Sequence, residues 1–319
     1  MSACLFALVA LLSTHDAKAL TAQAPVTVPG GSGSFDFMNI DNRDRLAFAC
    51  QPGLSALAVI NLDSGEVKSV PLGVACNGVA ADSKGKKIYA AGPGKTLVQI
   101  DMTTWTKSGS LPLDGPGDSV MFDGRTSTVY VDNDDGTNLW FVDPATMKIT
   151  STVKIKEAPE VMVLDTGRNK IFQNIKSSNS LQVVDLNSKS VAAEFTLGDL
   201  TSPHGLAEDR KAGKLFSVGK NGKLVILDAD SGKILQTLDV AKNSDQIAYD
   251  TQLKRLYIPG SETIQTVQIT DTAASVIDSE PLPAGCHSVT VDPKTHDVWV
   301  AYKDASSSYV MKYVSSAKP

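Results

Sequence analysis

Seven polar residues recur along the chain at nearly constant intervals, and their types are those that bind ions or transfer protons. Each polar residue opens a short segment that ends in an aspartate five positions later. Successive polar residues are 41, 41, 42, 44, 41 and 42 positions apart. Four are acids and two are histidines, so if they lie together their charges need protons, a cation or a basic ligand. The seven are Asp36, Asn77, Asp118, Glu160, His204, Asp245 and His287.

Two histidines and one carboxylate open the last three of these segments. His204, Asp245 and His287 match the facial triad that binds a divalent transition metal, with Glu160 as a fourth expected ligand. Glu160, or Asp118 beside it, is the expected general base of a metal-assisted reaction. The cofactor that we expect is a divalent metal ion or none. The two remaining members of the set, expected to bind a ligand, are Asp36 and Asn77.

A second interpretation needs no ligand. Polar residues at the starts of strands often cap loops and fill channels with bound water. The residues alone therefore leave two classes of function open. One is a binding or scaffold protein, and the other is a metal-dependent hydrolase or lyase with its site at the same place.

The elements that must position these residues are short strands. Apolar residues alternate or run together for about six positions between Gly, Asp, Asn, Lys and Ser. After the aspartate, six of the seven segments carry an aliphatic–aromatic pair. The pairs are Ile88–Tyr89, Val129–Tyr130, Ile171–Phe172, Leu215–Phe216, Leu256–Tyr257 and Val298–Trp299. Four strands in about 40 residues are typical of a propeller blade, so we predict an all-β, seven-bladed β-propeller of four-stranded antiparallel blades.

The predicted ring closes through the start of the chain. The last repeat supplies only three strands, and Ala24–Pro29 is the expected fourth strand of that blade. Residues 20–319 then form one domain. Because each unit begins with its innermost strand, its first residue should lie at the mouth of the central channel.

Two aspartate patterns favour structure over chemistry. The aspartate at the fifth position occurs in all seven segments, whereas an active site needs a residue once, so we expect it to set a turn by accepting backbone N–H bonds. The run Asp132–Gly136 resembles a calcium loop but lacks the length and the final glutamate of an EF-hand, and we predict a hairpin turn there.

The first nineteen residues have the pattern of a secretory signal peptide. An apolar run at 3–12 is too short to span a bilayer, and Ala17 and Ala19 form a small-x-small cleavage pattern. We therefore expect a periplasmic or secreted protein without a membrane span. The mature chain would keep Cys50, Cys76 and Cys286, for which we predict a Cys50–Cys76 disulfide and one free thiol.

One segment resembles a known family. The sequence Val129-Tyr-Val-Asp-Asn133 followed by Leu139-Trp-Phe-Val-Asp-Pro-Ala-Thr146 is similar to the YVTN-type repeat of bacterial exported seven-bladed propellers. Looser copies occur at 256–260 and 298–302. The resemblance implies the fold. It leaves the activity open, because that scaffold hosts lactonases, lyases, redox-enzyme subunits and binding modules.

Composition excludes several classes of function. Hydrophobic residues make up 42% of the 319 residues and the net charge is −5, which does not suit binding to a phosphate backbone. The chain also lacks a GxSxG, HExxH, Walker or Rossmann motif in its required context. We expect a monomer whose partner is a small molecule or a protein and not a nucleic acid.

Overall fold

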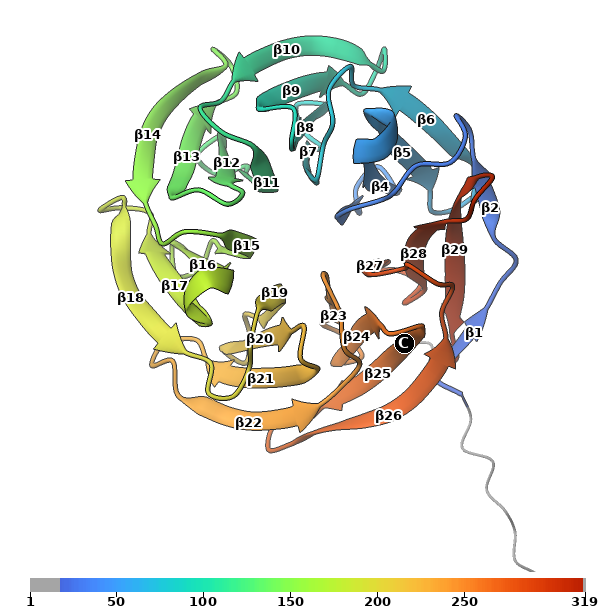
Figure 1. The fold of residues 1–319 in the computed structure, drawn as a ribbon, viewed down its shortest axis with the longest axis vertical. Coiled ribbons are helices and arrows are strands. Elements are labelled where there is room, and N and C mark those ends of the chain that lie inside the picture. The colour runs from blue at the N-terminus through green and yellow to red at the C-terminus, as the bar shows by residue number, and fades with distance from the viewer. Residues whose placement is uncertain (1–17, 318–319) are drawn as a thin grey trace, which may run out of the picture.

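The computed structural model describes residues 18–317, and these form seven antiparallel sheets around a central axis (Figure 1). The prediction of an all-β, seven-bladed propeller is confirmed. Only two short 3-10 helices interrupt the strands of the described part, at Pro52–Leu54 (η1) and Lys176–Ser178 (η2). No helix within residues 18–317 is long and apolar enough to cross a membrane.

The first three blades cover residues 38–154. Blade 1 contains β3 (Met38–Asp41), β4 (Leu46–Gln51), β5 (Ala56–Asn61) and β6 (Val67–Pro71). Blade 2 contains β7 (Gly78–Asp82), β8 (Lys87–Ala91), β9 (Thr96–Asp101) and β10 (Thr106–Pro112). Blade 3 contains β11 (Gly117–Asp123), β12 (Thr128–Asn133), β13 (Asn138–Asp143) and β14 (Lys148–Lys154).

The next three blades follow the same order from the axis outward. Blade 4 contains β15 (Pro159–Asp165), β16 (Lys170–Ile175), β17 (Ser180–Asp185) and β18 (Ser190–Thr196). Blade 5 contains β19 (Pro203–Asp209), β20 (Lys214–Gly219), β21 (Lys223–Asp228) and β22 (Ile234–Asp239). Blade 6 contains β23 (Ala248–Asp250), β24 (Arg255–Gly260), β25 (Thr263–Ile269) and β26 (Ala274–Pro281).

Blade 7 is built from both ends of the described chain. Its inner strands are β27 (Ser288–Val291), β28 (Val298–Lys303) and β29 (Ser308–Ser315). Two short segments, β1 (Leu20–Ala22) and β2 (Val26–Val28), pair with successive parts of β29. Closure by an N-terminal strand is therefore confirmed, and the closing segment begins earlier than the expected 24–29.

The aliphatic–aromatic pair that six repeats carry is explained by the two faces of a blade. In a strand, adjacent side chains point to opposite faces. Ile88 accordingly packs in the cluster between blades 1 and 2, and its neighbour Tyr89 packs in the cluster between blades 2 and 3. Val298 and Trp299 divide in the same way between the two neighbours of blade 7. The apolar core is thus a set of layers between blades.

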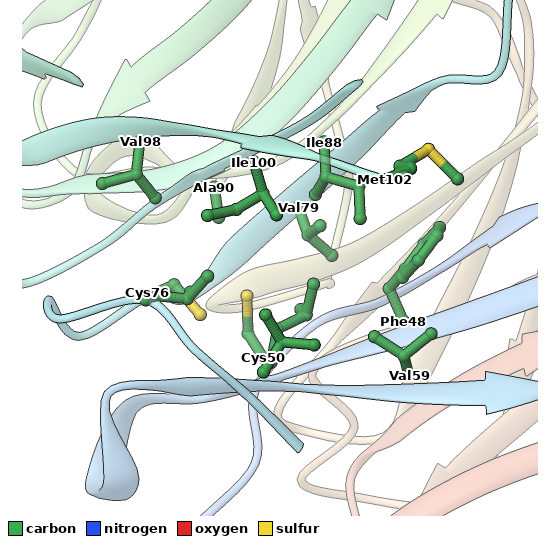
Figure 2. Packing of buried hydrophobic residues seen from close by; sticks show 13 residues of the cluster. Phe48, Cys50, Val59, Cys76, Val79, Ile88, Ala90, Val98, Ile100 and Met102 are labelled. Atoms are coloured by element: carbon green, nitrogen blue, oxygen red, sulfur yellow. The ribbon is translucent and has the colours of Figure 1, made fainter. Parts of the chain in front are cut away.

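The predicted disulfide is absent from this core. Cys50, Cys76 and Cys286 are all buried free thiols. Figure 2 shows the sulfur atoms of Cys50 and Cys76 facing each other among the apolar residues between blades 1 and 2. Burial raises the pKa of the Cys50 thiol well above its ordinary value. Because both Cys50 and Cys76 are buried in this apolar cluster, they act here as small hydrophobic side chains.

The recurring aspartate sets a turn, as expected. In every one of the seven blades its carboxylate accepts a backbone N–H from the turn that follows. Several of these carboxylates also contact the next blade. His296 Nδ1 lies 2.5 Å from Asp250, and the Tyr249 hydroxyl donates to Asp209 at 2.6 Å. The face of the ring that carries these turns is called the turn face below.

The predicted hairpin at 132–136 is also present. It joins β12 to β13, and the Gly136 N–H donates to the Asn133 carbonyl at 2.8 Å. The Asp132 carboxylate points into the protein, where it accepts hydrogen bonds from the Ser119 N–H and the Gln173 side chain. Asp132 is therefore part of the packing between blades 3 and 4.

Candidate binding site at the channel mouth

The seven recurring polar residues come together at one end of the central channel, opposite the turn face. Asp118, Glu160 and His204 lie near the start of their inner strands, and the other four precede theirs. Several of them contact one another. The Asn77 amide donates to Asp118 at 3.0 Å, and His287 Nδ1 lies 2.9 Å from Asp245 Oδ2. This end of the channel is called the channel mouth.

Blades 4 and 5 bring Glu160, His204 and a lysine together. Lys176 Nζ lies 2.6 Å from Glu160 Oε1, and His204 Nε2 lies 3.5 Å from the same oxygen. Burial raises the pKa of the Glu160 carboxyl, while Lys176 opposes that shift. The ammonium of Lys176 thus supplies the positive charge that this carboxylate needs.

Asp245 is similarly paired. It forms an ion pair with Lys220, and its second oxygen lies 2.9 Å from His287 Nδ1. Burial lowers the pKa of Lys220 to about 8 and also lowers the pKa of His287. The ammonium group of Lys220 therefore contacts one of the predicted metal ligands.

The hydrogen bonds of His204 define its protonation. Its Nδ1 lies 2.8 Å from the Ser202 carbonyl, which can only accept, so Nδ1 carries the proton. Burial, followed by the charge of Lys220, lowers the His204 pKa to about 4, and the ring is neutral at pH 7. Its Nε2 is then an acceptor directed toward Glu160 and Asp245, at 3.5 and 3.8 Å. His204 Nε2 and the carboxylate oxygens of Glu160 and Asp245 are thus three acceptors around one position, which suits an N–H donor.

The opposite arc of the mouth has carboxyl groups without such partners. Within residues 18–317, neither Asp36 nor Asp118 forms an ion pair with a lysine or arginine. Burial, opposed by the charge of His287, raises the Asp36 pKa to about 7. The pKa of Asp118 is raised well above its usual range by burial and by the charges of Asp132 and Asp36. This arc therefore lacks the lysine ion pairs that Glu160 and Asp245 have.

Below the mouth, Gln246 crosses the inner strand of blade 7. Its Oε1 accepts the N–H groups of Met38 at 3.0 Å and Val289 at 3.3 Å, and its Nε2 donates to the Met38 carbonyl at 2.7 Å. The amide links blade 6 to blade 1 across the closing blade.

The structure places every predicted site residue at the mouth, but the lysines change its chemistry. Lys176 and Lys220 each follow the second strand of their blade, and they are 44 residues apart, as are Glu160 and His204. This shared interval of 44 residues is the sequence feature from which Lys176 and Lys220 could have been predicted as site residues. In the described part of the chain no group of three His, Cys, Asp or Glu side chains is arranged to hold a metal ion. The divalent metal stays a prediction.

Comparison with known proteins supports the fold. No family model and no curated protein matches the sequence. Among solved structures, hydrazine synthase of Kuenenia stuttgartiensis is 12% identical, with a TM-score of 0.78 over 90% of this chain and 96% of that one. A chain of the mitotic checkpoint complex has a TM-score of 0.79 at 12% identity, covering 97% of both chains.

A third similar structure, the WD40 repeats of RRP9, has a TM-score of 0.78 at 12% identity over 92% of this chain and 100% of that one. These likenesses establish a seven-bladed propeller with WD40-like neighbours. The finer resemblance to YVTN-type propellers stays a prediction, because no family model matches.

Proposed function

We propose that this protein is a binding or scaffold propeller whose channel mouth receives a cationic group, an ammonium or a guanidinium, from a small molecule or a protein partner. One observation carries the proposal: within residues 18–317, no lysine or arginine forms an ion pair with the buried Asp118 or with the half-buried Asp36 at the mouth. Buried carboxyl groups are costly unless they are protonated or paired with a cation. A cationic ligand would supply that pair.

The other arc supports the same class of ligand. There, Glu160 and Asp245 are each paired with a lysine ammonium of this chain. The mouth thus already binds two ammonium groups by means of carboxylates and a neutral imidazole. Propellers of similar architecture occur in the mitotic checkpoint complex and as the WD40 repeats of RRP9, which is compatible with a scaffold role.

The test is calorimetric titration of the purified protein with spermidine and with arginine methyl ester at pH 7.5. We expect saturable binding that is lost in the double variant Asp36→Asn/Asp118→Asn. A suitable control is Asp239→Asn, which removes one exposed carboxylate on the outer strand β22. Equal binding by the double variant and the wild type would contradict the proposal, since the cation would then bind elsewhere.

The same titration with Zn²⁺, Mn²⁺ and Ca²⁺ examines the alternative function. A metal-dependent hydrolase or lyase requires stoichiometric metal that is lost in His204→Ala/His287→Ala. Metal binding of that kind, without amine binding, would favour the lactonase-like alternative over the one proposed here.

Export is a separate proposal that rests on the sequence of residues 1–19. Residues 1–17 lie outside the described part of the chain. Cleavage after Ala19 would create a new α-amino group on Leu20, whose nitrogen lies 3.3 Å from Asp278 Oδ2. That carboxylate would then pair with the new terminus. N-terminal sequencing of protein recovered from the periplasm should begin at Leu20, and size-exclusion chromatography should show a monomer.

A further inference from the structure

Directly below the channel mouth, the inner strands line a cavity with largely apolar walls. This cavity, called the lower chamber here, has a volume of about 320 Å³ and reaches from Gln246 to Thr251 and Pro293 at the turn face. Six blades contribute side chains to it. Representative lining residues are Met38, Met121, Val163, Leu206, Tyr249 and Val289.

The chamber and the mouth follow one another along the same segments of the chain. Met38 of the chamber stands two positions after Asp36 of the mouth, and Leu206 stands two positions after His204. An extended chain advances about 3.3 Å per residue, so the two members of each pair are about 7 Å apart along the chain. One small molecule is long enough to contact both.

The walls of the lower chamber offer little to a charged occupant. Among its lining residues, all within 18–317, Asp250 carries the only charge. Both oxygens of Asp250 are already used, one by His296 Nδ1 at 2.5 Å and the other by two N–H groups of the following turn. The amides of Asn39 and Gln246 are hydrogen-bonded to backbone groups. The part of a ligand that lies here therefore gains most by being apolar and uncharged.

The lower chamber also has room for such a group. Met121 and Val163 line it from the innermost strands of blades 3 and 4, and both are only half-buried. An engineered apolar cavity of about 150 Å³ accepts benzene. A chamber of about 320 Å³ therefore suits an aromatic ring together with a short alkyl chain.

We propose that the channel mouth and the lower chamber form one site for an amphipathic amine, whose ammonium pairs with Asp36 and Asp118 while its apolar body lies in the chamber. The ligand class is a primary amine that carries an arylalkyl chain. This inference rests on the proposed function, which supplies the cationic group. It adds the apolar body by which the protein would select one cation over another.

The experiment is calorimetric titration of the whole protein at pH 7.5 with three related compounds. They are 4-phenylbutylamine, butylamine, which lacks the ring, and 4-phenylbutan-1-ol, which lacks the charge. We expect 4-phenylbutylamine to bind with a Kd of roughly 0.1–1 mM. It should bind roughly tenfold or more tightly than butylamine, because its ring leaves water, and roughly tenfold more tightly than the alcohol, because its ammonium pairs with carboxylates.

Substitutions at both ends of the site test the placement of the ligand. Val163→Trp fills the chamber from blade 4 and Met121→Trp fills it from blade 3, and each should weaken binding of 4-phenylbutylamine roughly tenfold, toward the affinity of butylamine. Val276→Trp, at an exposed position on the outer strand β26, is the matched control and should bind as the wild type does. Asp36→Asn/Asp118→Asn should reduce the affinity for 4-phenylbutylamine to that for the alcohol.

The outcomes separate this inference from the proposed function. If spermidine binds but 4-phenylbutylamine binds no more tightly than butylamine, the apolar body is wrong and the cationic mouth stands. Wild-type affinity for 4-phenylbutylamine in both tryptophan variants, with circular dichroism showing that they are folded, would also overturn the placement in the chamber. Undiminished binding of 4-phenylbutylamine by the double asparagine variant would remove its ammonium from the mouth. If no amine binds, spermidine included, the proposed function fails and this inference fails with it.

Discussion

Replacing Asp36 by asparagine should stabilise the protein at alkaline pH and have little effect at acid pH. The change keeps the shape of the side chain and removes its ionisation. The pKa of Asp36 is raised from 3.8 to about 7 in the folded protein, by burial first, against the opposing charge of His287. A carboxyl with a raised pKa binds its proton more tightly in the folded state, so the free energy of unfolding falls as pH rises from about 4 to 7.

The size of the effect follows from the shift. The difference of about 3 pKa units corresponds to about 4 kcal/mol at pH 8, at 1.36 kcal/mol per unit. Residues 18–317 number 300 by subtraction, and at about 2.1 cal/mol/K per residue the unfolding entropy is about 0.6 kcal/mol/K. The melting temperature of Asp36→Asn should therefore exceed that of the wild type by about 6 °C at pH 8.

The assay is thermal unfolding of both proteins at pH 4, 6 and 8, followed by circular dichroism. Asp239→Asn is the control, because it makes the same substitution at an exposed position on the outer strand β22. A melting-temperature difference between Asp36→Asn and wild type that stays constant from pH 4 to pH 8 would refute the reasoning. So would a loss of stability that grows with pH.

Three other predictions concern the ring itself. Deleting residues 20–28 removes β1 and β2, leaves the edge of β29 unpaired, and should lower the melting temperature by several degrees or cause aggregation; an unchanged melting curve would count against closure. Denatured, unreduced protein freed of residues 1–19 should react with three equivalents of a thiol reagent, matching its free Cys50, Cys76 and Cys286, and a count of one would restore the disulfide. Gln246→Leu leaves the Met38 N–H and carbonyl without their side-chain partners. It should reduce the free energy of unfolding, measured by urea titration, by about 1–3 kcal/mol. An unfolding midpoint equal to that of the wild type would show that water replaces the amide.

The fold could be predicted because its information is local and repeated. The turn-setting aspartates occur in all seven blades and the aliphatic–aromatic pairs in six of them, and each can be recognised without knowing where the other blades lie. The chemistry of the mouth could not be predicted as fully. Whether Lys176 reaches Glu160 depends on the path of the connection between β16 and β17, which the repeat pattern does not contain.

The disulfide prediction failed for a related physical reason. Cys50 and Cys76 do face each other, as their positions in neighbouring blades suggested (Figure 2). Proximity does not make a bond, and in a well-packed apolar layer two thiols fill space as other small apolar side chains do. The turn of Asp132–Gly136 was predictable, by contrast, because hairpin geometry is set by adjacent residues.

The way blade 7 is assembled has a consequence for how the chain is made. β1 and β2 are synthesised before β3–β28, yet within residues 18–317 they pair with β29, which is synthesised after all of these strands. The ring cannot close until β29 has left the ribosome. Throughout that time the segment before β3 has no strand partner, and the bond between Ala19 and Leu20 remains accessible to enzymes that process N-termini. The order of synthesis therefore separates N-terminal processing from the final folding step.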